Sequence, residues 1–200
     1  MPASTAIRPA FRDAVRESQS VFRLAMRAMA SPGRILPLTS PLAPPPPLNA
    51  PAAALLLTLC DFETPVWVDL PLAAGAGAAE FLRFHTGARL VASPREAAFA
   101  VVTASGHMPA LAAFAQGTPQ YPDRSATLII QVETLSSNGW RLEGPGIRST
   151  IRLGAAPLPP DFADQLRANR AAFPCGVDIF LATRDALAAL PRSARLMETG

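Results

Sequence analysis

The chain has 200 residues and a formal net charge of +3, and all 18 of its Lys and Arg positions are arginine. A chain of this length can bury roughly 70% of its unfolded surface, which predicts a single domain over residues 1–200 with no need of a disulfide or metal. The absence of lysine excludes the Schiff base of pyridoxal phosphate enzymes, the GK[ST] loop of P-loop nucleotidases and the phosphate-binding lysine of protein kinases.

The remaining composition indicates a soluble protein of the cytoplasm. Cys60 and Cys175 lie inside apolar runs without a paired spacing, which favours free thiols in a reducing compartment. The longest apolar run, residues 50–60, is far shorter than the ~20 residues of a membrane span, and the first residues contain no continuous apolar core. We therefore expect neither membrane insertion nor export. Nucleic-acid binding is also not expected, because the arginines are scattered and aromatic residues make up only 6% of the chain.

The first predicted element is an amphipathic helix over residues 11–31. Apolar residues recur along it at steps of three, four and seven, and we expect them to face the core: Phe11, Val15, Phe22, Met26 and Met29. Arginines form a parallel stripe, in which Arg16 can pair with Asp13. Arg23 and Arg27 have no acidic partner within a turn. They are either solvated or form a subunit contact or an anion site.

The middle of the chain alternates between predicted helices and strands. A proline-rich segment over residues 37–51 predicts an extended, polyproline-like connector on the surface. Helices are then expected over residues 52–62, 78–86 and 108–116, and strands over 66–70, 99–103 and 126–134. Alternation of this kind is typical of an α/β sheet layered by helices.

The following segment breaks this alternation. Two strands, residues 140–143 and 149–153, are separated only by the short stretch "GPGIR", which predicts antiparallel neighbours. A helix over residues 161–171, a strand over 177–182 and a short element around 187–196 follow. The predicted fold class is therefore a single α/β domain whose sheet is mixed, with a parallel part and an antiparallel ribbon.

Three motifs have both a functional and a structural interpretation. Gly144 and Gly146 could cradle a phosphate, but they lead into a strand instead of a helix, which favours a structural turn. Asp61 and Glu63 form an acid pair at a helix-to-strand junction, which suits acid–base chemistry, a metal site or an ordinary helix end, and no clustered histidines are present to complete a metal site. His107 lies in a predicted loop with no visible partner.

The stretch "RFHTGARLV", residues 83–91, raises the question whether its histidine is catalytic. A helical projection of residues 78–86 places His85 on the same arc as Phe81, Leu82 and Phe84, with Arg83 on the opposite side. Gly87 is well placed to end the helix. We therefore predict that His85 is a buried structural residue and that Arg83 is free to reach a partner or ligand.

Six strings together resemble the PhnH family of carbon–phosphorus lyase subunits: "VFRLAMRAMASPGRI", "LLLTLCDFETPVWVDLP", "FLRFHTGARLV", "ATLIIQV", "LEGPGI" and "FPCGVDIFLA". They occur in the family's order and spacing over nearly the whole chain. The resemblance implies a homodimer that acts in a core complex with PhnG, PhnI and PhnJ, and a fold like that of the pyridoxal phosphate transferases without the cofactor. It also implies that the complex transfers a phosphonate such as methylphosphonate to the ribose C1 of ATP and releases adenine. The resemblance assigns no catalytic residue.

Two hypotheses for the role of the chain remain open at this stage. In the first, arginines such as Arg23 and Arg83 hold phosphate oxygens of ATP or of the phosphonate. In the second, which the sequence favours, the chain is a structural subunit without activity of its own, because no nucleophile, metal-ligand set or phosphate loop can be found. Under both hypotheses we expect no cofactor and no metal, with ATP as a substrate of the complex.

Overall fold

A computed structural model describes residues 10–75 and 77–197, so both ends of the domain predicted over residues 1–200 lie outside the described part. The α-helices are α1 (Ala14–Ala30), α2 (Ala50–Leu59), α3 (Leu70–Ala74), α4 (Ala78–Thr86) and α5 (Phe162–Ala171). The 3-10 helices are η1 (Pro94–Glu96), η2 (Ser105–His107), η3 (Leu111–Ala113) and η4 (Pro122–Arg124). The strands are β1 (Leu36–Pro37), β2 (Pro65–Val68), β3 (Arg89–Val91), β4 (Phe99–Val102), β5 (Thr127–Gln131), β6 (Thr134–Glu143), β7 (Ile151–Ala156), β8 (Asp178–Ala182), β9 (Ala186–Leu190) and β10 (Arg195–Leu196).

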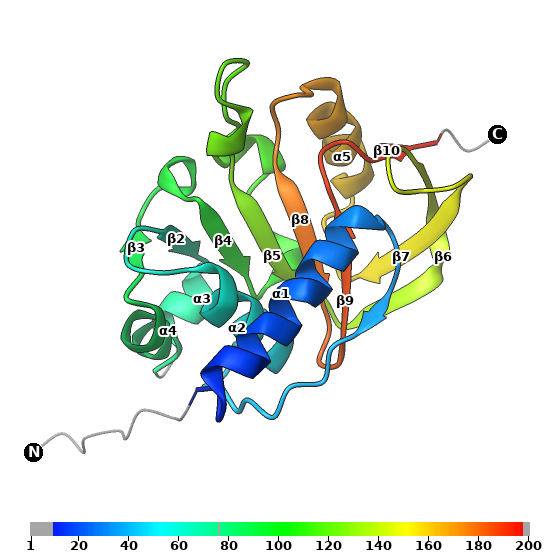
Figure 1. Cartoon of the computed structure of the whole chain (residues 1–200). Helices are drawn as coiled ribbons and strands as arrows, with labels where there is room; N and C mark the ends of the chain where they lie inside the picture. Colours follow the sequence, from blue (N-terminus) through cyan, green and yellow to red (C-terminus); the bar gives the residue numbers. More distant parts are fainter. Residues whose placement is uncertain (1–9, 76, 198–200) are drawn as a thin grey trace, which may run out of the picture.

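The central feature is a seven-stranded sheet in the order β1-β9-β8-β5-β4-β2-β3. The five strands from β3 to β8 in this order are parallel, whereas β9 is antiparallel to β8 and β1 is antiparallel to β9. A second, antiparallel sheet has the order β10-β6-β7 and lies beside the first (Figure 1). The prediction of a mixed α/β sheet with an antiparallel ribbon is confirmed.

Side chains alternate along each strand of the large sheet, so each strand contributes residues to both faces. Both faces are buried, each in its own cluster of apolar side chains. Ile129 and Phe180 belong to the cluster on the face covered by α1, α2, α3 and α4. Their neighbours Leu128 and Ile130 belong to the other cluster, which contains residues of α5, η3 and the β6–β7 ribbon. The sheet is thus the middle layer, with α1, α2, α3 and α4 on one face and α5 with the β6–β7 ribbon on the other (Figure 1).

Helix α1 does not pack against the core through the face that carries its bulky apolar residues. Its buried residues are Val21, Ala25 and Ala28. Val15, Phe22 and Met26 were expected in the core but are 68%, 49% and 56% exposed. Bulk was therefore a poor guide to the buried side of this helix, which presents two alanines to the core. Phe11 and Met29, the ends of the predicted stripe, do pack against the core.

Two other predictions in the middle of the chain are wrong. The strand expected over residues 126–134 stops at Gln131, and β6 begins at Thr134 and continues to Glu143 with a bulge between Ser136 and Trp140. The helix expected over residues 108–116 is only the single turn η3. The Gln116 side-chain amide donates to the carbonyl oxygens of Leu111 and Phe114, both at 2.9 Å, and so satisfies this turn without a longer helix.

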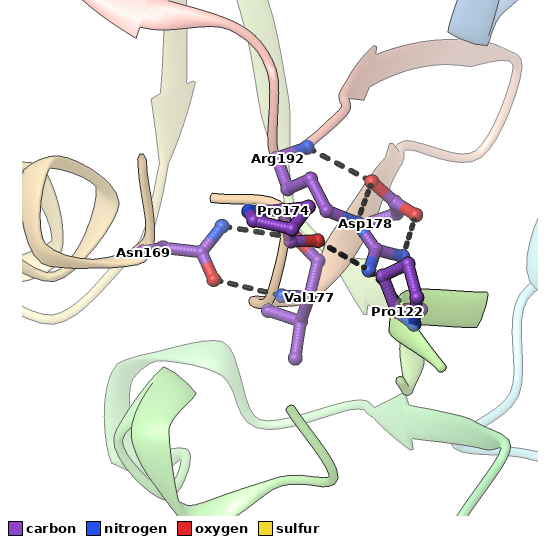
Figure 2. Close-up of polar contacts among 6 residues, drawn as sticks. All are labelled: Pro122, Asn169, Pro174, Val177, Asp178 and Arg192. Atoms are coloured by element: carbon purple, nitrogen blue, oxygen red, sulfur yellow. Dashed lines mark hydrogen bonds and ion pairs between the residues drawn. The ribbon is translucent and has the colours of Figure 1, made fainter. Parts of the chain in front are cut away.

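The amino edge of the parallel strands is held together by buried and partly buried polar groups (Figure 2). Asp178, the first residue of β8, accepts hydrogen bonds from the main-chain N–H and the Nε of Arg192, at 2.8 and 3.2 Å. Arg192 also donates to the carbonyl oxygen of Pro122 at 2.7 Å. Beside this pair, the Asn169 amide bonds both main-chain groups of Val177, at 2.8 and 2.9 Å. These contacts join α5, β8 and the segments that precede β5 and follow β9.

None of the helices in the described part of the chain is long and apolar enough to cross a lipid bilayer.

Candidate functional site

A pocket of about 950 Å³ opens at the carboxyl edge of the parallel strands. Strands β4, β5 and β8 are neighbours that run in the same direction, so the residues that follow them meet at one edge of the sheet. Ligands of open α/β sheets bind at this edge. The pocket is lined by Pro47, Asn49, Thr103, Ala104, Ser105, Gly106, His107, Gln131, Val132, Glu133, Pro157, Thr183, Arg184 and Asp185.

Asp69, the residue after β2, holds one wall of this pocket in place. The residue is only 6% exposed, and its carboxylate accepts hydrogen bonds from the main-chain N–H groups of Thr103 and Ala104 at 2.6 and 2.8 Å. The Thr103 hydroxyl and the N–H of Leu72 donate to the same carboxylate, at 2.9 and 3.2 Å. One buried acid therefore caps α3 and fixes the loop after β4.

The end of the proline-rich connector forms another part of the wall. The Gln131 amide, at the end of β5, donates to the carbonyl oxygen of Pro47 at 2.9 Å and accepts from the N–H of Asn49 at 2.6 Å. Asn49 in turn caps α2 by accepting from the N–H of Ala52 at 2.8 Å. The connector was predicted as a surface crossing, and its end is in fact tied to the carboxyl edge of the sheet.

Some of the polar side chains that line the pocket make no hydrogen bond or ion pair with another described residue. His107, Glu133 and Arg184 are exposed, and over residues 10–75 and 77–197 no hydrogen bond or ion pair engages any of the three side chains. Asp185 is exposed as well, but it accepts from the Thr183 hydroxyl at 3.0 Å. A guanidinium, an imidazole and carboxylates in one pocket can bind the anionic and the hydroxyl groups of a ligand.

The arginines singled out in the sequence lie on the helical layer instead. Arg23 on α1 donates to the side chain of Gln19 at 3.1 Å and lines a shallow hollow with Phe22 and Thr58. Arg27 is exposed on the same helix, and Arg83 is exposed on α4. None of these three arginines lines the carboxyl-edge pocket, and their role as anion or subunit contacts stays a prediction.

The acid pair does not converge with other catalytic groups. Asp61 accepts hydrogen bonds from the Thr64 hydroxyl at 2.8 Å and from the N–H of Glu63 at 3.0 Å, so its carboxylate closes the turn between α2 and β2. Glu63 is exposed in that turn. In the described part of the chain, no three His, Cys, Asp or Glu side chains come close enough to hold a metal ion.

His85 lies in a cluster of aromatic rings. It is partly buried, and its ring meets those of Phe81 and Phe84 edge-on, with centroids 4.6 and 5.0 Å apart. Phe84 was expected on the buried face but is 66% exposed, because α4 packs through Phe81 and Leu82. Gly87 ends the helix as predicted: its φ is 71°, and its N–H donates to the carbonyl oxygen of Arg83 at 2.9 Å. The structural role of His85 remains a prediction.

Cys60 is not a candidate nucleophile. Its thiol is buried, and burial, aided by the nearby charge of Asp61, raises its pKa to about 12. The thiol is therefore protonated and unreactive at neutral pH.

Sequence reasoning missed Glu133, Arg184 and Asp185, and noted His107 only as an isolated loop residue. A signal was present, because each of these residues closely follows an apolar run that became a parallel strand: "FAVV", "TLIIQ" or "DIFLA". What the sequence did not reveal is that these three strands are adjacent. Adjacency brings the charged residues into one pocket.

Comparisons with known proteins agree with the resemblance seen in the sequence. Residues 9–197 match the family described as bacterial phosphonate metabolism protein (PhnH). The chain is 43% identical over 188 residues to the alpha-D-ribose 1-methylphosphonate 5-triphosphate synthase subunit PhnH of Rhizobium meliloti, and the match covers 94% of each chain. It is also 30% identical to HtxG of Stutzerimonas stutzeri, described as a candidate C-P lyase subunit, over 89% of this chain and 85% of that protein.

Proposed function

The chain belongs to the PhnH family of bacterial phosphonate metabolism proteins, and on this premise we propose that it is a subunit of the carbon–phosphorus lyase core complex. In this proposal it supports the transfer of a phosphonate to the ribose C1 of ATP, with release of adenine and formation of a ribose 1-phosphonate 5-triphosphate. The observation that carries the proposal is the 43% identity, over 94% of both chains, to a protein named as a subunit of that synthase.

The proposal extends to the setting in which the subunit works. Its partners are the family's PhnG, PhnI and PhnJ subunits and a second copy of itself, and the complex acts in the cytoplasm. No pyridoxal phosphate step is included, because the sequence has no lysine to form the Schiff base, and any likeness of the fold to pyridoxal phosphate transferases is a likeness of the backbone alone. The nucleotide is a substrate and not a resident cofactor.

The carboxyl-edge pocket is an argument for direct contact between this subunit and ATP, the substrate that supplies the ribose. A volume of about 950 Å³ is at the upper end of the ~300–1,000 Å³ of small-molecule sites. Its cation and carboxylates match the phosphates and ribose hydroxyls of a nucleotide, as in other α/β proteins.

The alternative is a purely structural subunit that assembles the complex without touching substrate. The exposed apolar side chains of α1, Val15, Phe22 and Met26, support it, since they lie on the same helix as the exposed Arg23 and Arg27. An apolar stripe edged by arginine is typical of a protein interface. Assembly through α1 does not by itself exclude substrate contact at the pocket, because α1 does not line the pocket.

The proposed function is tested in a strain that lacks its own PhnH and receives this chain with an affinity tag. We expect growth on methylphosphonate as the sole phosphorus source, and co-purification of the other synthase subunits with the tag. Growth on phosphate controls for viability. Failure both to restore growth and to retain the subunits would refute the proposal.

The α1 surface is tested by replacing Arg23 and Arg27 together with alanine. We expect the free energy of unfolding to change by no more than ~0.5 kcal/mol, because both side chains are exposed. The yield of co-purified subunits or the dimer content should fall, as measured by affinity capture and sedimentation. Arg95→Ala, at an exposed arginine on η1, is the matched control. Normal assembly of the double variant would mean that this stripe is merely solvated.

A further inference from the structure

A second, smaller pocket of about 280 Å³ lies between two segments that are far apart in the sequence. One wall is the turn after α1, with Ser31 and Arg34. The other is the loop between β6 and β7, with Gly146, Arg148, Ser149 and Thr150. This loop contains the glycine motif that the sequence had suggested as either a phosphate cradle or a structural turn.

The lining of this pocket is cationic and rich in hydroxyl donors. Arg34 and Arg148 are both exposed, and within the described residues neither side chain has a carboxylate or carbonyl partner. Aspartate and glutamate are absent from the lining. The hydroxyl groups of Ser31, Ser149 and Thr150 add donors beside the two guanidinium groups. The carboxyl-edge pocket differs in this respect, because it contains Glu133 and Asp185.

Close backbone packing holds the two walls together. Gly33 has a φ of 75°, and a Cβ there would lie 2.8 Å from side-chain atoms of Ile151 and Leu142. Gly146 has a φ of 83°, and its Cβ would lie 2.2 Å from the carbonyl oxygen of Ala30. The positive φ favours glycine at both positions, and at Gly146 the close atom belongs to the backbone, which cannot shift as a side chain can. The N–H of Gly33 also donates to the carbonyl oxygen of Ala189 at 2.9 Å, which anchors the turn to the central sheet. The main chain that carries both arginines is therefore fixed before any ligand binds.

We propose that this pocket binds a tetrahedral phosphorus oxyanion through Arg34 and Arg148. Guanidinium groups bind phosphonate and phosphate oxygens in pairs of parallel hydrogen bonds, and hydroxyl donors complete the shell of such an anion. The volume is below the ~300–1,000 Å³ of sites for whole drug-sized ligands, and so suits a single small anion. The choice of a phosphonate as the physiological ligand rests on the proposed function, whereas the site itself rests on the geometry.

The site is tested by isothermal titration of the purified full-length chain with methylphosphonate, and separately with inorganic phosphate. Arg34→Gln and Arg148→Gln remove one guanidinium charge each from exposed positions, so both variants should fold normally, as thermal unfolding will verify. We expect each to weaken binding by about tenfold or more. Arg95→Gln, at an exposed arginine outside the pocket, should bind as the parent does, and the neutral dimethyl ester of methylphosphonate should not bind.

The outcomes separate the possible sources of the anion. Tighter binding of methylphosphonate than of phosphate identifies the site with the phosphonate substrate, and equal binding identifies it with a phosphate group, such as one of the triphosphate. Absence of binding by either anion, or binding that both substitutions leave unchanged, overturns the proposal. Growth of the complemented strain decides the proposed function separately, because the titration uses the isolated chain.

Discussion

The two edges of the parallel strands use charged residues in opposite ways. At the amino edge, Asp178 and Arg192 bond each other, and Asn169 satisfies both main-chain groups of Val177 (Figure 2). At the carboxyl edge, His107, Glu133 and Arg184 are exposed around a pocket, and their side chains make no hydrogen bond or ion pair with another described residue. The first edge uses polar groups to join segments of the fold, and the second leaves them available to a ligand.

This difference follows from what pairing does to a charged group. A partly buried charge with a partner stabilises the fold only as long as the partner remains, and its loss leaves an uncompensated charge. An exposed charge without a partner contributes little to folding and keeps its full capacity to bind. We therefore expect substitutions at the amino edge to change stability, and substitutions around the carboxyl-edge pocket to change function.

The largest expected change in the free energy of unfolding is that of Asp69→Ala. Asp69 lies at the carboxyl edge, but its carboxylate is hydrogen-bonded, so it tests whether pairing or position decides the role of a charge. Asp69→Ala would leave the N–H groups of Leu72, Thr103 and Ala104 without their acceptor. Unsatisfied buried groups cost ~1–3 kcal/mol each. Leu72 is buried, whereas Thr103 and Ala104 are partly buried and line the pocket, so we expect a loss of about 4 kcal/mol in the free energy of unfolding. Urea denaturation measures it. A loss below ~1 kcal/mol would show that the wall of the pocket is not held by this acid.

Asp178→Ala tests the amino edge. The side chains of Arg192 and Asp178 are only 15% and 23% exposed, so removing the carboxylate leaves a poorly solvated guanidinium. We expect a loss of about 3 kcal/mol, measured by the same denaturation.

Asp164→Ala is the matched control for this substitution, because Asp164 pairs with Arg167 on the exposed surface of α5. It should cost no more than ~1 kcal/mol. Equal losses at the two aspartates would remove the distinction between a stabilising edge and an exposed surface.

Local patterns predicted most of the fold. Helix α4 begins and ends where its apolar spacing and Gly87 indicate, and the short "GPGIR" connection correctly indicates an antiparallel ribbon. The failures arise where tertiary contacts decide. Helix α1 turns its alanines toward the core, and Gln116 bonds the carbonyl groups of a segment that was expected to be a longer helix.

The candidate site was less accessible to sequence reasoning. His107, Glu133 and Arg184 come from three strands, and only the order of the sheet places them around one pocket. Strand order depends on long-range pairing, which no local periodicity encodes. The same limit applies to Arg34 and Arg148, which are brought together by the contacts of Gly33 and Gly146.

Arg184→Ala should have the smallest effect on stability and gives the sharpest test of the comparison. The side chain is exposed and has no partner in the described part of the chain, so the free energy of unfolding should change by no more than ~0.5 kcal/mol. If Arg184 binds a phosphate group of ATP, loss of that charge-assisted bond should lower phosphonate-dependent turnover of the assembled complex by about tenfold. Arg95→Ala, which removes an exposed arginine away from the pocket, should leave both quantities unchanged. Reduced stability of Arg184→Ala with normal turnover would reverse the assignment, because the carboxyl edge would then stabilise the fold as the amino edge does.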